Sequence, residues 1–398
     1  MKKLLSCLAC LVIASGVIAS GLVVVACNKT DNQPQKHQLV EIEKDLQKVI
    51  DGNKQLWTAQ ALQAKIDQVL PKVIGLEVRQ GEIDPQIGVE TFDLDADHSQ
   101  QFTGQLQLSQ VLNEENQNQT IYLDHLTHKI TIAKQWSAPE GTREILNIGW
   151  YDYGLAHALP STVEKVPNYI SPKISNLDDF FANIQNFNCY EVSLWDTSHI
   201  TQMARTFFLA KAFNQDLSQW NVTNVTDMQS MFYGAQNFNG DVTTWNTAHV
   251  INMDSMFREA SVFNQNLHQW NTSNVEEMPE MFASAKAFNG DLSTWNTTKV
   301  REMPEMFASA KAFSGDLSKW NTSQVLDMSE MFVQTDHFNC NLGQWDTSKV
   351  TNMESMFDRA KIFIQDLSKW NVALVTNHKN FANNPNWPKE QQPHFKNH

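Results

Sequence analysis

The chain has 398 residues, a formal net charge of −14 at pH 7 and 19% charged residues, and its length can hold two or three domains. Because it is acidic and has no cluster of lysine and arginine, we expect neither nucleic acid nor anionic lipid as a partner. The acidity is explained most simply by solubility.

Residues 1–26 predict a secretory signal peptide, with two lysines, a long apolar run and small residues before Cys27. The sequence Val-Val-Ala-Cys resembles a bacterial lipobox, in which Cys27 is the lipidated first residue of the mature chain, although Val24 stands where leucine is usual. A retained membrane helix is the alternative, because the run exceeds about 18 residues. The lipobox predicts an acyl anchor, a flexible tether over residues 27–37, and a position on the outer face of the cell membrane.

Residues 38–144 predict a small α+β domain. Apolar residues recur at helical spacing from Leu39 to Ile50 and again from about Thr58 to Val69. From Val73 onward, short apolar segments between turn residues predict strands, and two of these segments lie within residues 120–136.

This domain shows no motif of known chemistry. His98, His125 and His128 match no ligand spacing, so we expect exposed loop histidines and no metal site. The chain has no nucleophile elbow, phosphate loop or zinc-protease motif. We therefore predict that it is not an enzyme and that it has no cofactor and no small-molecule substrate, and only a convergent acid or histidine pair in this domain would revive a catalytic role.

A 25-residue repeat runs through residues 195–377, and one unit, residues 213–237, reads FNQDLSQWNVTNVTDMQSMFYGAQN. Self-similarity at such a period is the signature of a solenoid, in which each unit contacts only its neighbours. One tryptophan recurs in every unit: Trp195, Trp220, Trp245, Trp270, Trp295, Trp320, Trp345 and Trp370.

Each unit predicts one strand and one short helix. The segment DLSQWNV fits the strand of a leucine-rich repeat, with Trp220 in place of the second leucine. Apolar residues at helical spacing predict a helix over about residues 228–236, capped by Asp227, and Pro279 and Pro304 fall in its first turn in their own units. The predicted fold class is an α/β solenoid, a leucine-rich-repeat-like stack preceded by a small α+β domain.

Both ends of the stack predict caps, which solenoids need because an end repeat would expose its apolar flank. Residues 145–194 carry a degraded unit, in which Ile174, Leu177 and Phe181 stand 26 residues before their equivalents. Residues 378–398, rich in asparagine and proline, form the C-terminal cap and tail.

Several repeated side chains have both a structural and a functional interpretation. The tryptophans could stack sugars or bases, but we expect core because each lies at an inward strand position. The methionines at the phase of Met228 are expected in the core and not as soft-metal ligands. The aspartates at the phase of Asp216 could bind Ca²⁺, but Asx turns explain them more simply.

Cys189 and Cys340 are about six units apart, which at ~4.8 Å per stacked strand is roughly 29 Å. A disulfide needs Cα atoms within about 7 Å, so we predict no bond between them and no zinc site.

The surface most free to bind is expected at the two outward strand positions beside each tryptophan. Plain solvation or a stabilising asparagine ladder is the alternative for these positions. The candidate residues are Gln219, Asn221, Thr244, Asn246, Gln269, Asn271, Thr294, Asn296, Lys319, Asn321, Gln344, Asp346, Lys369 and Asn371.

The unit from Trp270 to Trp295 resembles BspA-like leucine-rich-repeat surface proteins and, more closely, a repeat family of unknown function common in mycoplasma surface lipoproteins. The resemblance covers about residues 145–390. It implies a lipid-anchored surface protein that interacts with a host or cell-surface macromolecule, in the manner of an adhesin. The alternative is a structural or antigenic coat protein with no specific ligand.

Overall fold

The computed structural model describes residues 9–11, 24–26, 36–51, 59–71, 73–84, 89–111, 118–124, 126, 130–134 and 136–396. The chain divides into two compact units, Met1–Gln117 and Asn118–His398. Each unit has its own hydrophobic core.

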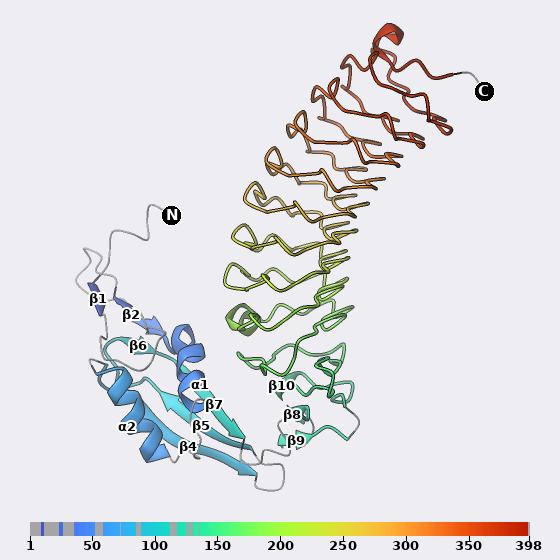
Figure 1. Ribbon diagram of the computed structural model, residues 1–398. Helices are drawn as coiled ribbons and strands as arrows, with labels where there is room; N and C mark the ends of the chain where they lie inside the picture. Colours follow the sequence, from blue (N-terminus) through green and yellow to red (C-terminus); the bar gives the residue numbers. More distant parts are fainter. Residues whose placement is uncertain are drawn as a thin grey trace. The chain divides into compact units, whose positions relative to one another are not determined.

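The first unit is a helix-on-sheet structure, drawn in blue and cyan in Figure 1. Strands β4 (Glu77–Asp84), β5 (Val89–Asp95) and β7 (Gln105–Val111) form an antiparallel sheet in the order β4-β5-β7. The 3₁₀ helix η1 (Leu39–Ile42) leads into α1 (Glu43–Asp51), which lies against β7, while α2 (Ala59–Val69) lies against β4. These helices and strands lie where the apolar periodicity predicts them. Two short strands, β3 (His37–Gln38) and β6 (Phe102–Thr103), pair in parallel.

The predicted leader is described only at β1 (Ala9–Leu11) and β2 (Val24–Ala26), which pair antiparallel. Cys27 lies outside the described residues, so the signal peptide and the lipid anchor stay predictions. In the described part of the chain no helix has the length and apolar character needed to cross a membrane.

The second unit begins before the predicted boundary at residue 145. Strands β8 (Ile121–Leu123), β9 (Ile130–Ile132) and β10 (Glu144–Asn147) form an antiparallel sheet in the order β10-β8-β9. Tyr122 and Ile145 belong to the same hydrophobic core as the repeats. The predicted boundary is therefore wrong, and residues 118–144 belong to the second unit. The alternation of apolar residues predicts a strand but does not show which core its side chains enter.

Residues 195–377, called the repeat stack from here on, form successive turns that lie one beside the next in Figure 1. Each turn is joined to the next by one parallel β-bridge at an equivalent position, for example Asp227 to Asn252 and Asn252 to Glu277. The leucine-rich-repeat-like solenoid class remains a prediction, since within the described residues the repeats contain isolated bridges and no longer strand.

The helix predicted over residues 228–236 is absent, and this part of each unit is a series of turns. Alternate N–H groups bond to the next turn of the stack, as Ser230 N does to Asp254 O at 2.7 Å, while Met231 N bonds within its own turn to Met228 O at 3.2 Å. Ser230 (φ 51°) and Gly234 (φ 64°) adopt left-handed backbone conformations, which breaks the dihedral pattern of an α-helix. The helix prediction is wrong because a run of turns can also place apolar residues at this spacing on one face, toward the core.

The core of the repeat stack consists of columns of identical side chains. The phenylalanine rings at the phase of Phe232 stack on their neighbours with centroids 5.4–5.7 Å apart, as between Phe232 and Phe257 at 5.5 Å. The methionines at the phase of Met228 are fully buried. Ring stacking in the core therefore joins successive turns in addition to the backbone hydrogen bonds between them.

The ends of the stack break this pattern. At the start, Phe181 stacks on Phe207 at 5.1 Å, as expected for a degraded unit, and η3 (Tyr190–Leu194) precedes the first tryptophan. At the far end, Trp387 meets Phe363 at 80° instead of stacking, followed by η4 (Lys389–Gln391). A perpendicular ring closes the column, because it offers no parallel face to a further turn.

Candidate binding groove on the repeat stack

The eight repeat tryptophans lie in the core of the second unit. The indole Nε1–H of each donates to a carbonyl 28 residues earlier, as Trp295 does to Leu267 O at 3.0 Å. Five of the seven adjacent pairs of indoles stack with centroids 6.1–6.3 Å apart and planes within 7°. Buried rings with satisfied N–H groups have no face left for a sugar or a base.

The asparagines predicted on the binding face are exposed, but they hold turns together. The Oδ1 atom of Asn221 accepts the N–H of Thr223 at 3.0 Å, and Asn296 accepts that of Thr298 at 3.1 Å. Asn246, Asn271, Asn321, Asp346 and Asn371 repeat this contact. Since the side-chain oxygen is engaged by the residue's own turn, this column has a structural task, although the contact is an Asx turn and not the ladder named as the alternative.

The neighbouring column of predicted binding residues is also exposed: Gln219, Thr244, Gln269, Thr294, Lys319, Gln344 and Lys369. Two of its hydroxyls are engaged by the previous turn, since Thr244 Oγ1 donates to Ser218 O at 3.0 Å and Thr294 Oγ1 donates to His268 O at 2.5 Å. The remaining members leave charged and amide groups available at the surface.

The aspartate column is explained by the Asx turns that were the simpler alternative. Asp316 Oδ1 accepts the N–H of Ser318 at 2.9 Å, and Asp366 accepts that of Ser368 at 3.0 Å. Hydrogen bonds from Ser318 hold the pKa of Asp316 below its usual value. Among the described residues no group of three or more His, Cys, Asp or Glu side chains could hold a metal ion.

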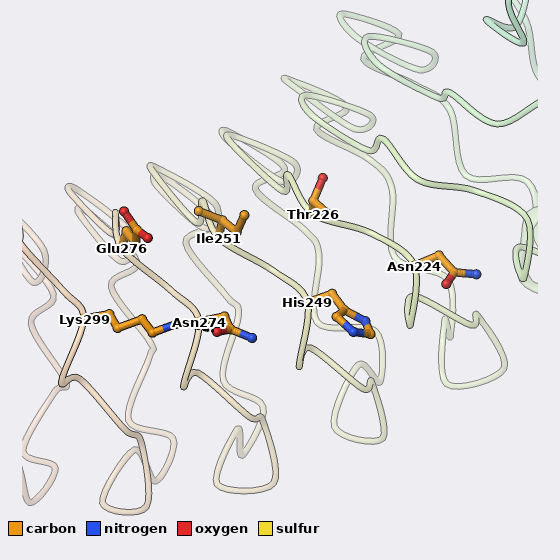
Figure 2. A pocket seen from close by; sticks show the side chains of 7 residues that line it. All are labelled: Asn224, Thr226, His249, Ile251, Asn274, Glu276 and Lys299. Carbon is orange, nitrogen blue, oxygen red and sulfur yellow. Dashed lines mark hydrogen bonds between the residues drawn. The ribbon is translucent and has the colours of Figure 1, made fainter.

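A shallow groove of about 440 Å³ lies beside the asparagine column. Figure 2 shows its lining side chains arriving from four consecutive turns, two from each turn except the last. They are Asn224, Thr226, His249, Ile251, Asn274, Glu276 and Lys299. Within each turn the two positions are separated by a buried valine, so both side chains project to the same outer side.

Hydrogen bonds to the previous turn fix one wall of the groove. Asn224 Nδ2 donates to Ser198 O at 2.8 Å, and Asn274 Nδ2 donates to Ala248 O at 2.7 Å. The His249 Nδ1 atom lies 2.7 Å from a backbone carbonyl, so this nitrogen carries the proton. Lys299 Nζ donates to Asn274 Oδ1 at 2.6 Å, the contact drawn in Figure 2.

The positions that line the groove change from turn to turn, whereas the positions with structural hydrogen bonds are nearly constant. The first wall position is occupied along the stack by His199, Asn224, His249, Asn274, Lys299, Gln324, Lys349 and Leu374. The second is occupied by Thr201, Thr226, Ile251, Glu276, Arg301, Leu326, Thr351 and Thr376. This variation between repeats was visible in the sequence and was the signal that could have located the groove.

The remaining candidates show no reactive chemistry. Cys189 and Cys340 are free thiols. Burial raises the pKa of Cys189 to about 12 and that of Cys340 to about 11, so neither is a thiolate nucleophile at neutral pH. His98 is exposed in a turn of the first unit, and His125 and His128 lie outside the described residues.

Comparison with family models gives three overlapping matches, to residues 157–250, 240–336 and 288–393, and all three are to the Mycoplasma protein family of unknown function DUF285. Together they span more than half of the chain. The chain belongs to this family. No curated protein and no solved structure matches it. The family match includes every residue of the groove and stops short of the first unit.

Proposed function

We propose that this protein is a lipid-anchored cell-surface protein whose repeat stack binds a host or cell-surface macromolecule through the groove. The observation that carries the proposal is the contrast between constant structural columns and the variable columns of the groove. The variable side chains stand at fixed positions on the stack, and a fixed array of different exposed groups is what a recognition surface needs.

The lining chemistry supports a polar macromolecular ligand. Glu276 and Lys299 bring opposite charges to the same groove, and Asn224 and Thr226 add amide and hydroxyl groups. Such a mixture recognises a partner by complementary hydrogen bonds and charges. The groove is too shallow and open to enclose a small molecule, since ligand pockets bury most of their ligand's surface.

A cell-binding assay tests this function. We expect the purified chain to bind cultured epithelial cells or immobilised matrix proteins at micromolar concentration. The triple variant His249→Ala, Glu276→Ala, Lys299→Ala should lose most of that binding. The control carries Gln219→Ala, Gln269→Ala and Gln344→Ala on the neighbouring exposed column. Equal binding by both variants, or no binding by the native chain, would contradict the proposal.

A coat protein without a specific ligand is the second candidate. Successive turns are joined through the same bridge position, so whole units can be gained or lost while this contact between neighbours is kept. Frequent changes in repeat number between close strains, with no preference at the groove positions, would favour the coat. The absence of enzymatic activity remains a prediction.

A further inference from the structure

An exposed aromatic cluster lies in the second unit, outside the groove and just before the residues that match the family model. It consists of Trp136, 60% exposed, Tyr153, 71% exposed, and the half-buried Tyr151 between them. The two tyrosine rings stack with planes 4° apart and centroids 5.4 Å apart, and Trp136 lies 5.4 Å from Tyr151. Contiguous exposed aromatic rings of this kind mark an interaction site.

A short hairpin holds the tyrosines in place. Trp150 and Ala156 form an antiparallel bridge. Tyr151 N donates to Leu155 O at 2.9 Å, and Gly154 N donates to Tyr151 O at 2.8 Å. Gly154 has φ of 83°, a conformation that favours glycine at the tip. Tyr153 is therefore presented on a fixed turn.

A buried histidine supports the cluster from below. His157 is 1% exposed and packs at 69° to Tyr151 and at 67° to Trp136. The Thr120 hydroxyl donates to Trp136 O at 3.0 Å, so it accepts the proton of His157 Nδ1 at 3.1 Å. This single hydroxyl ties the tryptophan backbone to the histidine ring. Burial lowers the pKa of His157 and keeps the ring neutral at pH 7.

Trp136 and Tyr153 are exposed without a cation from the described residues over their rings, unlike another surface aromatic pair on the repeat stack. Phe208 and Tyr233 stack at 4.9 Å, but Arg205 covers the first ring and Arg258 the second, at 4.3 and 5.7 Å from the centroids. Within the described residues no cation covers the cluster. The exposed sides of the Trp136 and Tyr153 rings remain available to a partner that carries positive C–H edges.

We propose that Trp136, Tyr151 and Tyr153 form a carbohydrate-binding site that stacks a pyranose ring of a surface glycan. One face of a pyranose presents C–H groups to the aromatic rings, and its hydroxyls can bond to the tyrosine oxygens. Asp152, which is exposed between the two tyrosines in the chain, adds a carboxylate next to them. An apolar partner would desolvate that carboxylate without replacing the hydrogen bonds it makes to water, which is unfavourable.

The size of the cluster also favours a sugar over a protein. An aromatic side chain buries about 150–250 Å² when fully covered, so three partly exposed rings offer at most roughly 400 Å². A stable protein interface buries about 800 Å² on each partner. One or two sugar units match the cluster, and a protein surface would need contacts well beyond it.

The test is an array of defined neutral and sialylated oligosaccharides probed with the purified full chain, followed by titration with the best-bound oligosaccharide. We expect retention on the array, and Tyr153→Ala should weaken binding about tenfold or more, the effect of losing about 1.4 kcal/mol. Tyr153→Phe keeps the ring and should stay within about threefold, by the same relation. The control Tyr233→Ala, on the arginine-covered pair, should change nothing.

Three results would overturn the proposal: no oligosaccharide bound at millimolar concentration, equal binding by Tyr153→Ala, or a blank array together with loss of a protein partner in that variant. Trp136→Ala is a second probe, with circular dichroism to verify folding. The site is independent of the groove, so the triple groove variant should retain glycan binding even if the groove has no ligand.

Discussion

The substitution Trp295→Phe separates the hydrogen bond of a repeat indole from its packing. Trp295 is 4% exposed and stacks between Trp270 and Trp320, at 6.3 and 6.2 Å. Its Nε1–H donates to Leu267 O at 3.0 Å. Phenylalanine keeps an aromatic ring in the column but has no donor, so the bond to the previous turn is lost.

Two terms set the expected loss of stability. Leu267 O also accepts the N–H of Trp270 at 3.0 Å, so losing the indole leaves this carbonyl with one partner and costs about 1 kcal/mol. The smaller ring removes apolar surface equivalent to about two methylene groups, or ~1.6 kcal/mol. Together they predict a decrease of about 2–3 kcal/mol in the free energy of unfolding.

Urea unfolding followed by circular dichroism measures this decrease. Trp136→Phe is the matched control, because Trp136 is exposed and its side chain donates no hydrogen bond in the described structure; a change within about 0.5 kcal/mol is expected for it. Trp295→Ala should lose more than Trp295→Phe, about 3–5 kcal/mol. A loss below about 0.5 kcal/mol for Trp295→Phe, or one no larger than the control's, would refute this reasoning.

Three further predictions concern single turns. Thr272 Oγ1 donates to Asn296 O and accepts the N–H of Asn296, so Thr272→Val should lower the free energy of unfolding in urea by about 1–3 kcal/mol. Val222→Thr places the usual residue of this column in another turn and should raise that free energy by about 1 kcal/mol. Trp387→Ala removes the perpendicular ring that closes the stack, so we expect end-to-end oligomers in light scattering, and a strictly monomeric variant would contradict the capping role. The pKa of Asp316 is lowered in the folded chain. Its ionised carboxylate therefore stabilises the folded state above about pH 3.9, and this stabilisation is lost as the pH falls through the lowered pKa. Asp316→Asn keeps the acceptor oxygen but does not titrate, so the urea midpoint of this variant should fall less between pH 5 and 3 than that of the native chain.

The sequence located the core of the repeat stack because identical apolar residues at a constant spacing can only fall above one another. It failed on the backbone between them, since the spacing of Val225, Met228, Phe232 and Ala235 fits one face of a helix and one side of a run of turns equally well. The hydrogen bonds to the next turn and the left-handed residues between them distinguish the two.

A covariation within the repeats could have corrected the helix prediction. Where Asp227 stands, its carboxylate accepts the N–H of Gln229 at 2.9 Å. In the turns with Pro279 and Pro304 there is no such N–H, and the residue two positions before the proline is Glu277 or Glu302. From Asp227 onward, Asp or Asn therefore occurs where a turn N–H must be satisfied and Glu where proline removes it, a pattern that belongs to Asx turns.

The binding face predicted from the sequence lies beside the groove that we propose, and it stays a prediction. The asparagines next to each tryptophan are constant because they close turns, and constancy between repeats is the mark of a structural task. The groove residues lie three and five residues after the asparagine of each turn. Their residue type changes from turn to turn, as His249, Glu276 and Lys299 illustrate. The aromatic cluster around Tyr153 has no repeat, so no comparison between units could reveal it.

The central claim is that equivalent residues of successive repeats lie above one another at a constant separation. Paired spin labels measure it directly, at Gln219→Cys with Lys319→Cys, Gln344→Cys or Lys369→Cys, in a chain whose Cys189 and Cys340 are replaced by alanine. The account predicts narrow distance distributions near 20, 25 and 30 Å, a rise of about 5 Å per turn. Distances that do not increase by a constant step, or broad distributions for all three pairs, would contradict it.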